Sequence, residues 1–300
     1  MSSACPKWNV REETAESAER ARSSARLLGL VLRKAHATLA DDRQPFDGSR
    51  LDRRDPELVE TLLPLFERLN ASWLKLRVDG VENIPREPAL FVGNHSGGIM
   101  GPDLSCTLAT LWRRLGPAQP VYALAHDLAM RHLEPLGRLL QRVGCMRADP
   151  QNAHRALTEG GHVLVYPGGE LDAFRHYRDR HRVVFGRRAG FVRVAQRARV
   201  PIVPIVAHGA HASCVILDEG EWLARVLRLS GRRLLRVPIA LALPWGVAAG
   251  PLPYFPLPLP VRLEILPAQD VHPEDDPAEV RDVIVGRMQE AMDRMAGSAP

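Results

Sequence analysis

The sequence predicts an α/β fold, in which a largely parallel or mixed central sheet is flanked by helices. Over the middle of the chain, short apolar segments of strand length alternate with segments of helical periodicity. This alternation is typical of parallel sheets, because a helix between two strands returns the chain to the edge where the next strand starts. The strand-like segments are residues 89–93, 121–125, 162–166, 202–206 and 261–266, and the helical ones are residues 104–115, 128–142, 151–158 and 190–199.

Helical patterns also precede and follow this alternation. Residues 14–39 are rich in Ala, Glu and Arg, and residues 58–73 carry apolar side chains at steps of three or four. Residues 276–295 form a last helical pattern, which Pro277 opens. We therefore divide the chain into an N-terminal helical region (1–76), a central α/β domain (77–272) and a C-terminal helix (273–300).

The two N-terminal patterns are amphipathic, and they allow two interpretations. In the second pattern, one predicted apolar face consists of Leu58, Leu62, Leu65, Leu69 and Trp73. Such helices can lie in the interface of a membrane, with their apolar faces in the lipid. Alternatively, they pack on the central domain. Periodicity does not distinguish between a lipid and a protein surface as the partner of this face.

Charge and cysteine content narrow the class of protein. The formal net charge is +5, from 40 Lys and Arg against 35 Asp and Glu, which suits nucleic acid, anionic lipid or an anionic substrate. The four cysteines are far apart and contain no Cys-x-x-Cys pair. Their spacing argues against a zinc site and a disulfide framework, and favours a reducing compartment. Residues 1–16 are polar, so they do not resemble a secretory signal.

A charge-free apolar stretch, Val237–Val261, is long enough to cross a bilayer but contains seven prolines. Each proline inside a helix removes a backbone hydrogen bond and adds a steric clash. Unpaired backbone groups are costly in lipid. We therefore expect this stretch to lie on a surface or to line a cavity, and not to span a membrane.

A histidine and an aspartate are the first candidates for catalysis. The strand-like segment 89–93 runs directly into Asn94-His95-Ser96-Gly97-Gly98, and Asp103 follows eight positions after the histidine. In α/β folds, functional groups gather at the carboxyl ends of strands. A carboxylate that holds one imidazole nitrogen leaves the other free to remove a proton from a hydroxyl. The alternative is that His95 merely ends a strand and Asp103 merely caps a helix.

Two further loops carry candidate ligand groups. Pro167-Gly168-Gly169-Glu170 follows the strand-like segment 162–166, and its glycines can expose amide donors to an oxyanion or phosphate. Arg147 and Arg175 can grip an anion with their guanidinium groups. The alternatives are a tight turn for the glycines and solvated surface charges for the arginines.

Taken together, these segments resemble the glycerolipid acyltransferase superfamily over residues 78–267. Four blocks stand in the order typical of that superfamily, and the resemblance rests on their order and spacing. The blocks are residues 94–98 with Asp103, residues 144–147, residues 165–170 and residues 200–205.

The resemblance implies an O-acyltransferase with an HxD-type histidine-aspartate pair. His95 would deprotonate a lipid hydroxyl, which attacks the thioester of acyl-coenzyme A or acyl carrier protein, and Asp103 would orient His95. No metal and no cofactor beyond that co-substrate are implied. It also implies a peripheral or monotopic protein at the cytoplasmic face of a membrane. The apolar stretch near Trp245 and Tyr254 would then border the acyl chain or the bilayer. The implied substrate-binding residues are Ser96, Gly97, Gly98, Arg147, Pro167, Gly168, Gly169, Glu170 and Arg175.

Two departures from the commonest pattern affect the expected acceptor. Seven residues, not four, separate His95 from Asp103, and Gly168 replaces the acidic residue after Pro167. The Pro-Gly-Gly form is closest to the monoacylglycerol and diacylglycerol acyltransferase-like branch, which includes enzymes that act on neutral alcohols. An enzyme that acylates lysophosphatidic acid or glycerol phosphate stays an alternative, as does a catalytically silent lipid-binding relative.

Three other classes of protein receive less support. Residues 175–199 are dense in arginine, but a nucleic-acid binder would also carry interleaved aromatic residues or a known binding motif. Ser96 does not sit in a Gly-x-Ser-x-Gly elbow, as a serine hydrolase would require. The histidine pairs 208/211 and 176/181 lack the carboxylate pattern of a metal site, although the first pair follows a strand and can line the pocket.

Overall fold

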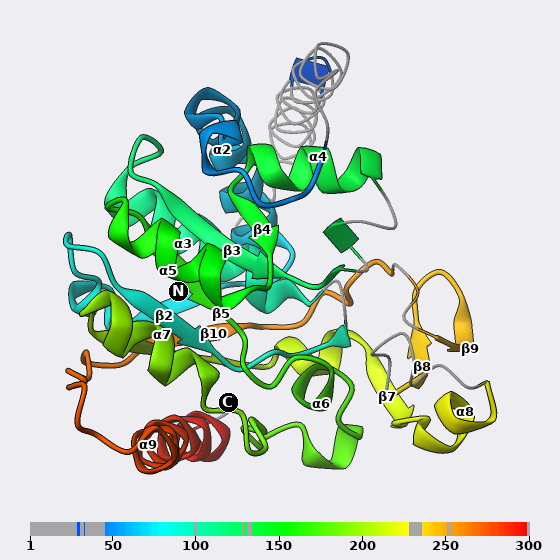
Figure 1. Cartoon of the computed structure of the whole chain (residues 1–300). Coiled ribbons are helices and arrows are strands. Elements are labelled where there is room, and N and C mark those ends of the chain that lie inside the picture. The colour runs from blue at the N-terminus through cyan, green and yellow to red at the C-terminus, as the bar shows by residue number, and fades with distance from the viewer. Residues whose placement is uncertain are drawn as a thin grey trace, which may run out of the picture. The chain divides into compact units, whose positions relative to one another are not determined.

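Seven strands form the central sheet of the computed structural model, in the order β1-β10-β6-β2-β5-β3-β4 (Figure 1). The five strands from β6 to β4 are parallel, whereas β10 runs antiparallel to β6 and parallel to β1. The sheet is therefore mixed but largely parallel. The strands are β1 (Arg77–Asp79), β2 (Leu90–Gly93), β3 (Val121–Ala125), β4 (Cys145–Arg147), β5 (His162–Val165), β6 (Ile202–His208) and β10 (Arg262–Ile265). The structure describes residues 29–30, 33, 46–98, 101–127, 129–130, 134–227, 236–250, 252 and 254–298.

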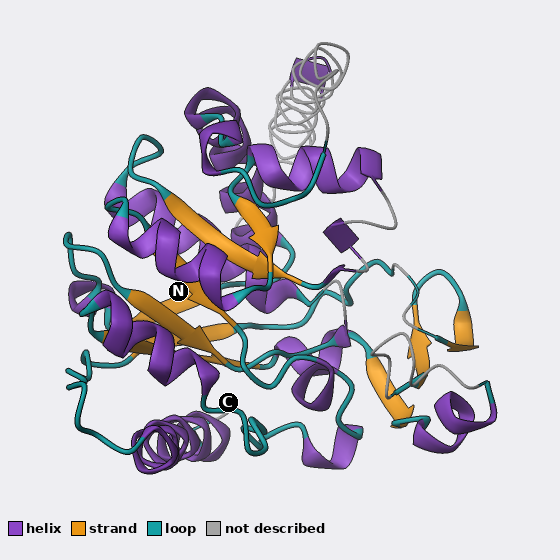
Figure 2. Ribbon diagram, in the orientation of Figure 1, coloured by secondary structure: helices purple, strands orange, loops and turns teal. Residues whose placement is uncertain are grey.

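Helices cover both faces of this sheet (Figure 2). Alternate strand residues point to opposite layers, as the pleat requires. Phe91 and Leu164 pack with the layer of α2 and α3, whereas Leu90 and Val163 pack with the layer of α5, α7 and α9. The helices are α2 (Pro56–Ser72), α3 (Pro102–Leu115), α4 (Glu134–Arg142), α5 (Pro150–Thr158), α7 (Gly190–Ala198) and α9 (Pro277–Gly297).

This architecture confirms the predicted α/β fold with a largely parallel central sheet. The predicted strands at 89–93, 121–125, 162–166, 202–206 and 261–266 correspond to β2, β3, β5, β6 and β10. The sequence did not reveal β1 and β4, because strands of three residues are too short for a periodic pattern. The helix predicted over 14–39 lies outside the described residues, apart from Gly29, Leu30 and Arg33. The domain boundaries after residues 76 and 272 stay predictions.

Helix α2 packs on the domain through a face that differs from the predicted one. The Asp55 carboxylate caps its N-terminus by accepting from the Leu58 amide at 3.0 Å. Val59 and Leu63 are buried in the same core as α3. Of the predicted apolar face only Leu58 is fully buried, and the other four side chains are half-buried. The buried face of α2 is therefore shifted by one residue from the predicted face and includes Val59 and Leu63.

A second, smaller sheet contains three antiparallel strands, β7 (Val215–Asp218), β8 (Ile239–Ala242) and β9 (Gly246–Ala249). The short helix α8 (Glu221–Val226) lies beside it, at the right of Figure 1. Strands β8 and β9 fall in the proline-rich stretch, where strands were not predicted. Pro238 and Pro244 lie outside the strands, so no ladder hydrogen bond is lost inside them. Within the described residues, no helix combines the length and hydropathy needed to cross a membrane.

The packing of α9 predicts a large difference between two neighbouring positions. Ile284 is fully buried, whereas Val283 is 53% exposed. We expect Ile284→Ala to lower the free energy of unfolding by about 2–5 kcal/mol, because it leaves a cavity in the core. Val283→Ala is the matched control and should change it by less than about 0.5 kcal/mol. Urea unfolding followed by circular dichroism measures both; equal effects would contradict the packing described.

Candidate active site

His95 and Asp103 form a hydrogen-bonded pair at the carboxyl edge of the sheet. Strand β2 ends at Gly93, and the chain turns through Asn94 to Gly98 before α3 begins at Pro102. His95 Nδ1 lies 2.8 Å from Asp103 Oδ2. The Asp103 side chain is fully buried, whereas the His95 side chain is 19% exposed. Because Nδ1 faces the carboxylate, Nε2 is the nitrogen left for a substrate.

The turn between the two residues depends on a close backbone approach. The Ser96 amide donates to Asp103 Oδ2 at 3.2 Å, so one carboxylate oxygen holds both the imidazole and the loop. A Cβ atom at Gly101 would lie 2.0 Å from the Ser96 carbonyl oxygen. Only glycine fits at this position without moving the loop. The seven-residue separation of His95 from Asp103 is therefore compatible with a direct contact.

The surroundings of His95 raise its pKa. Burial of the ring acts to lower the pKa, but the charge of Asp103 and its hydrogen bond outweigh that effect. The Tyr166 ring, at the end of β5, lies against the imidazole, with ring centroids 4.9 Å apart. Burial, followed by the nearby charge of Asp103, raises the pKa of Tyr166 well above its ordinary value, so the phenol stays neutral. The His95 imidazole therefore has a raised pKa, and one side of its ring is covered by the neutral Tyr166 ring.

A second carboxylate, Asp172, holds the backbone of His95. Asp172 lies in the short helix α6 (Glu170–Ala173), directly after the Pro167–Glu170 block. Its Oδ2 accepts from the His95 amide at 2.6 Å, and its Oδ1 accepts from the Val184 amide at 3.1 Å. Burial raises the pKa of Asp172 to about 6, against the opposing charge of Arg175.

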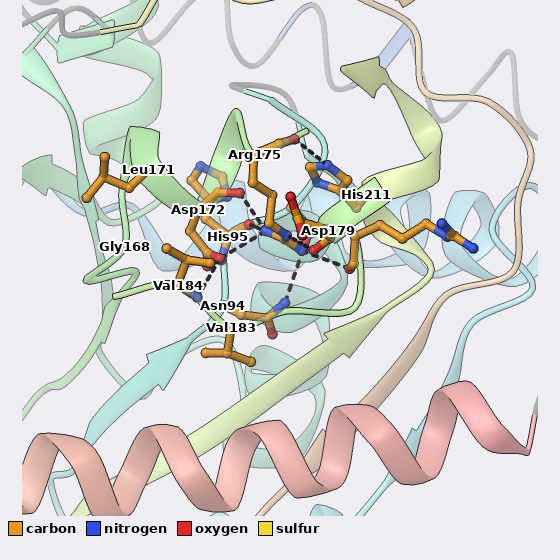
Figure 3. Close-up of polar contacts among 12 residues, drawn as sticks. Asn94, His95, Gly168, Leu171, Asp172, Arg175, Asp179, Val183, Val184 and His211 are labelled. Atoms are coloured by element: carbon orange, nitrogen blue, oxygen red, sulfur yellow. Dashed lines mark hydrogen bonds and ion pairs between the residues drawn. The ribbon is translucent and has the colours of Figure 1, made fainter. Parts of the chain in front are cut away.

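Arg175 is the counter-ion of Asp172 and the centre of the network in Figure 3. Its side chain is 2% exposed, and its Nη1 lies 2.9 Å from Asp172 Oδ1. Nη1 also donates to the His95 carbonyl at 2.7 Å, and Nη2 donates to Ser96 Oγ at 3.0 Å. Nε and Nη2 donate to the carbonyls of residues 179 and 180. Every guanidinium nitrogen donates to a protein oxygen, so this arrangement supports a role for Arg175 in positioning the loop and gives no support to the predicted role as a substrate ligand.

Two more buried side chains fix Gly97. His211 Nδ1 accepts from the Gly97 amide at 3.1 Å, and its Nε2 donates to the Arg175 carbonyl at 2.9 Å. Burial, then the charge of Arg175, lowers the pKa of His211 well below its ordinary value, so this ring stays neutral. The Tyr254 hydroxyl donates to the Gly97 carbonyl. Tyr254 is buried, so it supports the loop from within, whereas Trp245 is 52% exposed.

Asn94 and Ser96 complete the buried side of the loop. Asn94 pairs with the backbone of Ala207 on β6, donating at 3.1 Å and accepting at 2.7 Å. Ser96 Oγ accepts from both Asn94 and Arg175 and is 1% exposed. A serine nucleophile would need an accessible hydroxyl beside a base. The burial of Ser96 therefore argues against the serine hydrolase alternative.

The Pro-Gly-Gly turn packs tightly and does not offer all of its amides to a ligand. A Cβ atom at Gly168 would lie 2.4 Å from Asp172 Cβ and from the Val184 carbonyl oxygen. The Gly169 amide donates to the Tyr166 carbonyl at 3.0 Å. The Arg188 guanidinium donates to the carbonyls of residues 167 and 168. The prediction that these glycines offer amide donors to an anion gains no support at Gly169, whose amide already has a partner, and the missing side chain at Gly168 leaves room for Asp172.

Arg147 lies away from this network. It ends β4, and two strands separate β4 from β2 in the sheet. At the usual strand spacing this puts it roughly 14 Å along the carboxyl edge from His95. Its guanidinium binds the Asp127 carboxylate through two hydrogen bonds, at 2.7 and 3.2 Å. The prediction that Arg147 binds the substrate gains no support from this position, since its fork already holds a carboxylate.

The histidines at positions 176, 181, 208 and 211 do not belong to a metal-binding group in the described part of the chain. His181 and His208 stack, with ring centroids 5.1 Å apart. Within the described part of the chain, no three His, Cys, Asp or Glu side chains form a group that could hold a metal ion.

Sequence inspection missed Asp172, Tyr166 and Asn94 as members of the site. The spacing of Asp172 and Arg175 was a usable signal, because side chains three apart on a helical turn can form an ion pair. The contact of Asp172 with the His95 amide joins residues 77 positions apart. No local pattern in the sequence could reveal that contact.

The acyltransferase family model matches residues 75–208, which include both the His95 loop and Asp172. An uncharacterized protein of Mycobacterium tuberculosis is 32% identical over 212 residues, which are 70% of this chain and 56% of that protein. Over residues 75–208 the chain therefore matches the acyltransferase family. The resemblance inferred from the four blocks is thereby confirmed.

Two named enzymes share part of the sequence or the fold of this chain. Phytyl ester synthase 2 of Arabidopsis thaliana is 28% identical over 152 residues, 48% of this chain and 21% of that protein. The crystal structure of the 1-acyl-sn-glycerophosphate acyltransferase PlsC from Thermotoga maritima has the same fold, with a TM-score of 0.50 at 16% identity. It covers 89% of this chain and 88% of its own. The chain spans about half the length of the mycobacterial relative, 56%.

The buried pair predicts that this acyltransferase-family fold tolerates little change at Asp172. Asp172→Asn leaves the Arg175 guanidinium buried without its counter-charge, and we expect the free energy of unfolding to fall by about 3–5 kcal/mol. Asp179→Asn, in the same loop, is the control. Its carboxylate is 32% exposed and pairs with the exposed Arg178, so its loss should cost less than about 1 kcal/mol. Similar small losses for both variants in urea unfolding would contradict this assignment.

Proposed function

We propose that this protein transfers a fatty acyl group from an acyl thioester to a lipid hydroxyl, with His95 as the general base. The observation that carries the proposal is the 2.8 Å contact between His95 Nδ1 and Asp103 Oδ2 at the carboxyl edge of the sheet. It leaves Nε2 on a partly exposed ring whose pKa is raised. A base of this kind is suited to removing a proton near neutral pH.

The proposed reaction is a direct transfer between two substrates. Nε2 takes the proton of the acceptor hydroxyl while the oxygen attacks the thioester carbonyl carbon. The tetrahedral intermediate then expels the thiolate of coenzyme A or of acyl carrier protein, which receives the proton from the imidazolium. Asp103 stabilises that imidazolium and keeps its ring in place. An ester and a free thiol are the products, and the base returns to its starting form.

The acceptor that we propose is a neutral or otherwise unphosphorylated lipid alcohol. Arg147 and Arg175 were the candidate phosphate ligands, and each guanidinium already binds a carboxylate. A phosphorylated acceptor would have to compete with these internal ion pairs. The name of the phytyl ester synthase relative indicates esters of a neutral alcohol, which supports the same acceptor class.

A lipid acceptor also implies a membrane partner. We propose attachment to the cytoplasmic face of a membrane, without a requirement for nucleic acid. The wide cysteine spacing supports a reducing compartment. The three described cysteines are unpaired and buried, which agrees with that setting.

Replacement of the proposed base should remove the activity. We expect His95→Ala to lower the rate of acyl transfer by at least about 10²-fold, because general-base catalysis contributes that much or more. Radiolabelled acyl-coenzyme A and acyl carrier protein, each offered with monoacylglycerol, diacylglycerol, a long-chain alcohol and lysophosphatidate, measure the rate. His272→Ala, at an exposed histidine, is the control. Full turnover by His95→Ala would reject the mechanism, and inactivity of the wild type with every pair would favour a silent lipid-binding protein.

The pH profile tests the role of Asp103. The base works when deprotonated, so kcat/KM should fall as the pH drops through the pKa of His95. The Asp103 charge raises that pKa, and Asp103→Asn should therefore lower it. We expect the acidic limb of the kcat/KM profile to move to lower pH, together with a reduced plateau. An unchanged limb would show that Asp103 does not act on the titrating group.

A further inference from the structure

The three-stranded sheet has one face on which no other described helix or strand packs to form a hydrophobic core. Its inner face, with Ile216 and Ala240, packs on Tyr254 in a small core of its own. By alternation, the outer face carries the neighbours of these residues in the strands. Leu241 of β8 pairs with Val247 of β9, so these two side chains share the outer face.

This outer face is apolar, although antiparallel sheets usually turn polar side chains to water. Leu241 is 45% exposed and Val247 is 64% exposed. Leu217 of β7, Trp222 of α8 and Trp245 of the β8–β9 turn are also among the exposed apolar side chains of this region. We call these five residues the apolar sheet face. Exposed apolar side chains gathered in one region of a protein can mark an interaction site.

The composition of the surroundings favours a bilayer over a protein as the partner. No charged residue occurs from Val237 to Val261, which removes the polar rim that a specific protein interface usually has on that side. Two of the five side chains are tryptophans, which are enriched where an apolar surface meets a wet headgroup layer. Arg225 on α8 is exposed, and the chain carries a formal net charge of +5, a charge that complements anionic lipid.

The small sheet is connected to the loop that carries His95, so a membrane bound to the sheet would serve the proposed reaction. The segment that leads from β6 into β7 carries His211 and Ser213, and His211 binds the Gly97 amide. Ser213 Oγ lies 3.3 Å from the Tyr254 hydroxyl, which donates to the Gly97 carbonyl. The inner side of the small sheet is therefore attached to the catalytic loop. A membrane on its outer side would lie close to the site where a lipid acceptor must arrive.

We infer that the apolar sheet face docks the protein on an anionic bilayer and presents the His95 loop to acceptors in that bilayer. The inference rests on the proposed function in so far as the acceptor is a lipid. Arg225, which is exposed on α8, would meet the headgroups. The occupant is a membrane surface, and a second copy of the chain is the competing outcome of the test.

Flotation with vesicles tests the docking without any acyl donor. The probes are vesicles of phosphatidylcholine alone and of phosphatidylcholine with phosphatidylglycerol. We expect the wild type to bind the anionic vesicles, and Leu241→Ser with Val247→Ser to weaken that binding by about ten-fold or more, because two apolar side chains are lost from the lipid contact. Val283→Ser on α9, 53% exposed, is the matched control and should bind like the wild type.

Further readouts keep the two proposals distinguishable. His95→Ala should bind vesicles like the wild type, so a failure of the proposed mechanism leaves the docking test intact. Brominated phosphatidylcholine should quench the tryptophan emission of the wild type, and Trp222→Phe with Trp245→Phe should lose most of that quenching. Unchanged vesicle binding in the serine variant would overturn the inference. So would a wild-type dimer in light scattering that the serine variant converts to a monomer, because the face would then bind a second copy.

Discussion

The ion pair between Asp172 and Arg175 is the interaction on which the site depends most. Both side chains are buried, and between them they hold the His95 amide, the His95 carbonyl and the Ser96 hydroxyl. A charged pair so deep in the protein is costly unless every polar group finds a partner. Here these partners are backbone and side-chain groups of the loop that carries His95 and Ser96. The buried pair is therefore stable only when the loop holds the conformation that supplies these hydrogen bonds.

Two carboxylates thus serve one histidine in different ways. Asp103 contacts the ring, and its charge raises the pKa of His95. Asp172 contacts the backbone amide, and its own charge is compensated by Arg175. Because Arg175 neutralises Asp172, the carboxylate that acts most strongly on the imidazole is the one that also touches it. This division lets the loop be rigid while the ring stays partly accessible.

Much of the fold was predictable from the sequence, because it depends on local patterns. Strands β2, β3, β5 and β6 are apolar runs between helical segments, and the His95 loop follows the first of them. The small sheet was not predictable, since its strands lie in a proline-rich stretch that masks their pattern. Both faces of β8 are apolar as well, so the alternation that marks a half-buried strand is missing.

The site was predictable only in part, for a related reason. His95 and Asp103 are eight residues apart, and the intervening glycines indicate a turn that brings them together. The partners of Arg147 and Arg175 decide what these arginines can bind, and a sequence does not reveal those partners. Asp127 lies 20 residues before Arg147, and His95, whose carbonyl Arg175 binds, lies 80 residues before Arg175. Three-dimensional contacts therefore weaken the expectation that either arginine binds the substrate.

The most direct test of the central claim is nitrogen-15 NMR of the His95 imidazole across a pH titration. The claim is that Asp103 holds Nδ1 and leaves Nε2 as the base. It predicts a neutral ring that carries its proton on Nδ1, with a pKa above the ordinary histidine value that coincides with the acidic limb of kcat/KM. A ring protonated on Nε2, or a pKa that does not match that limb, would contradict the account.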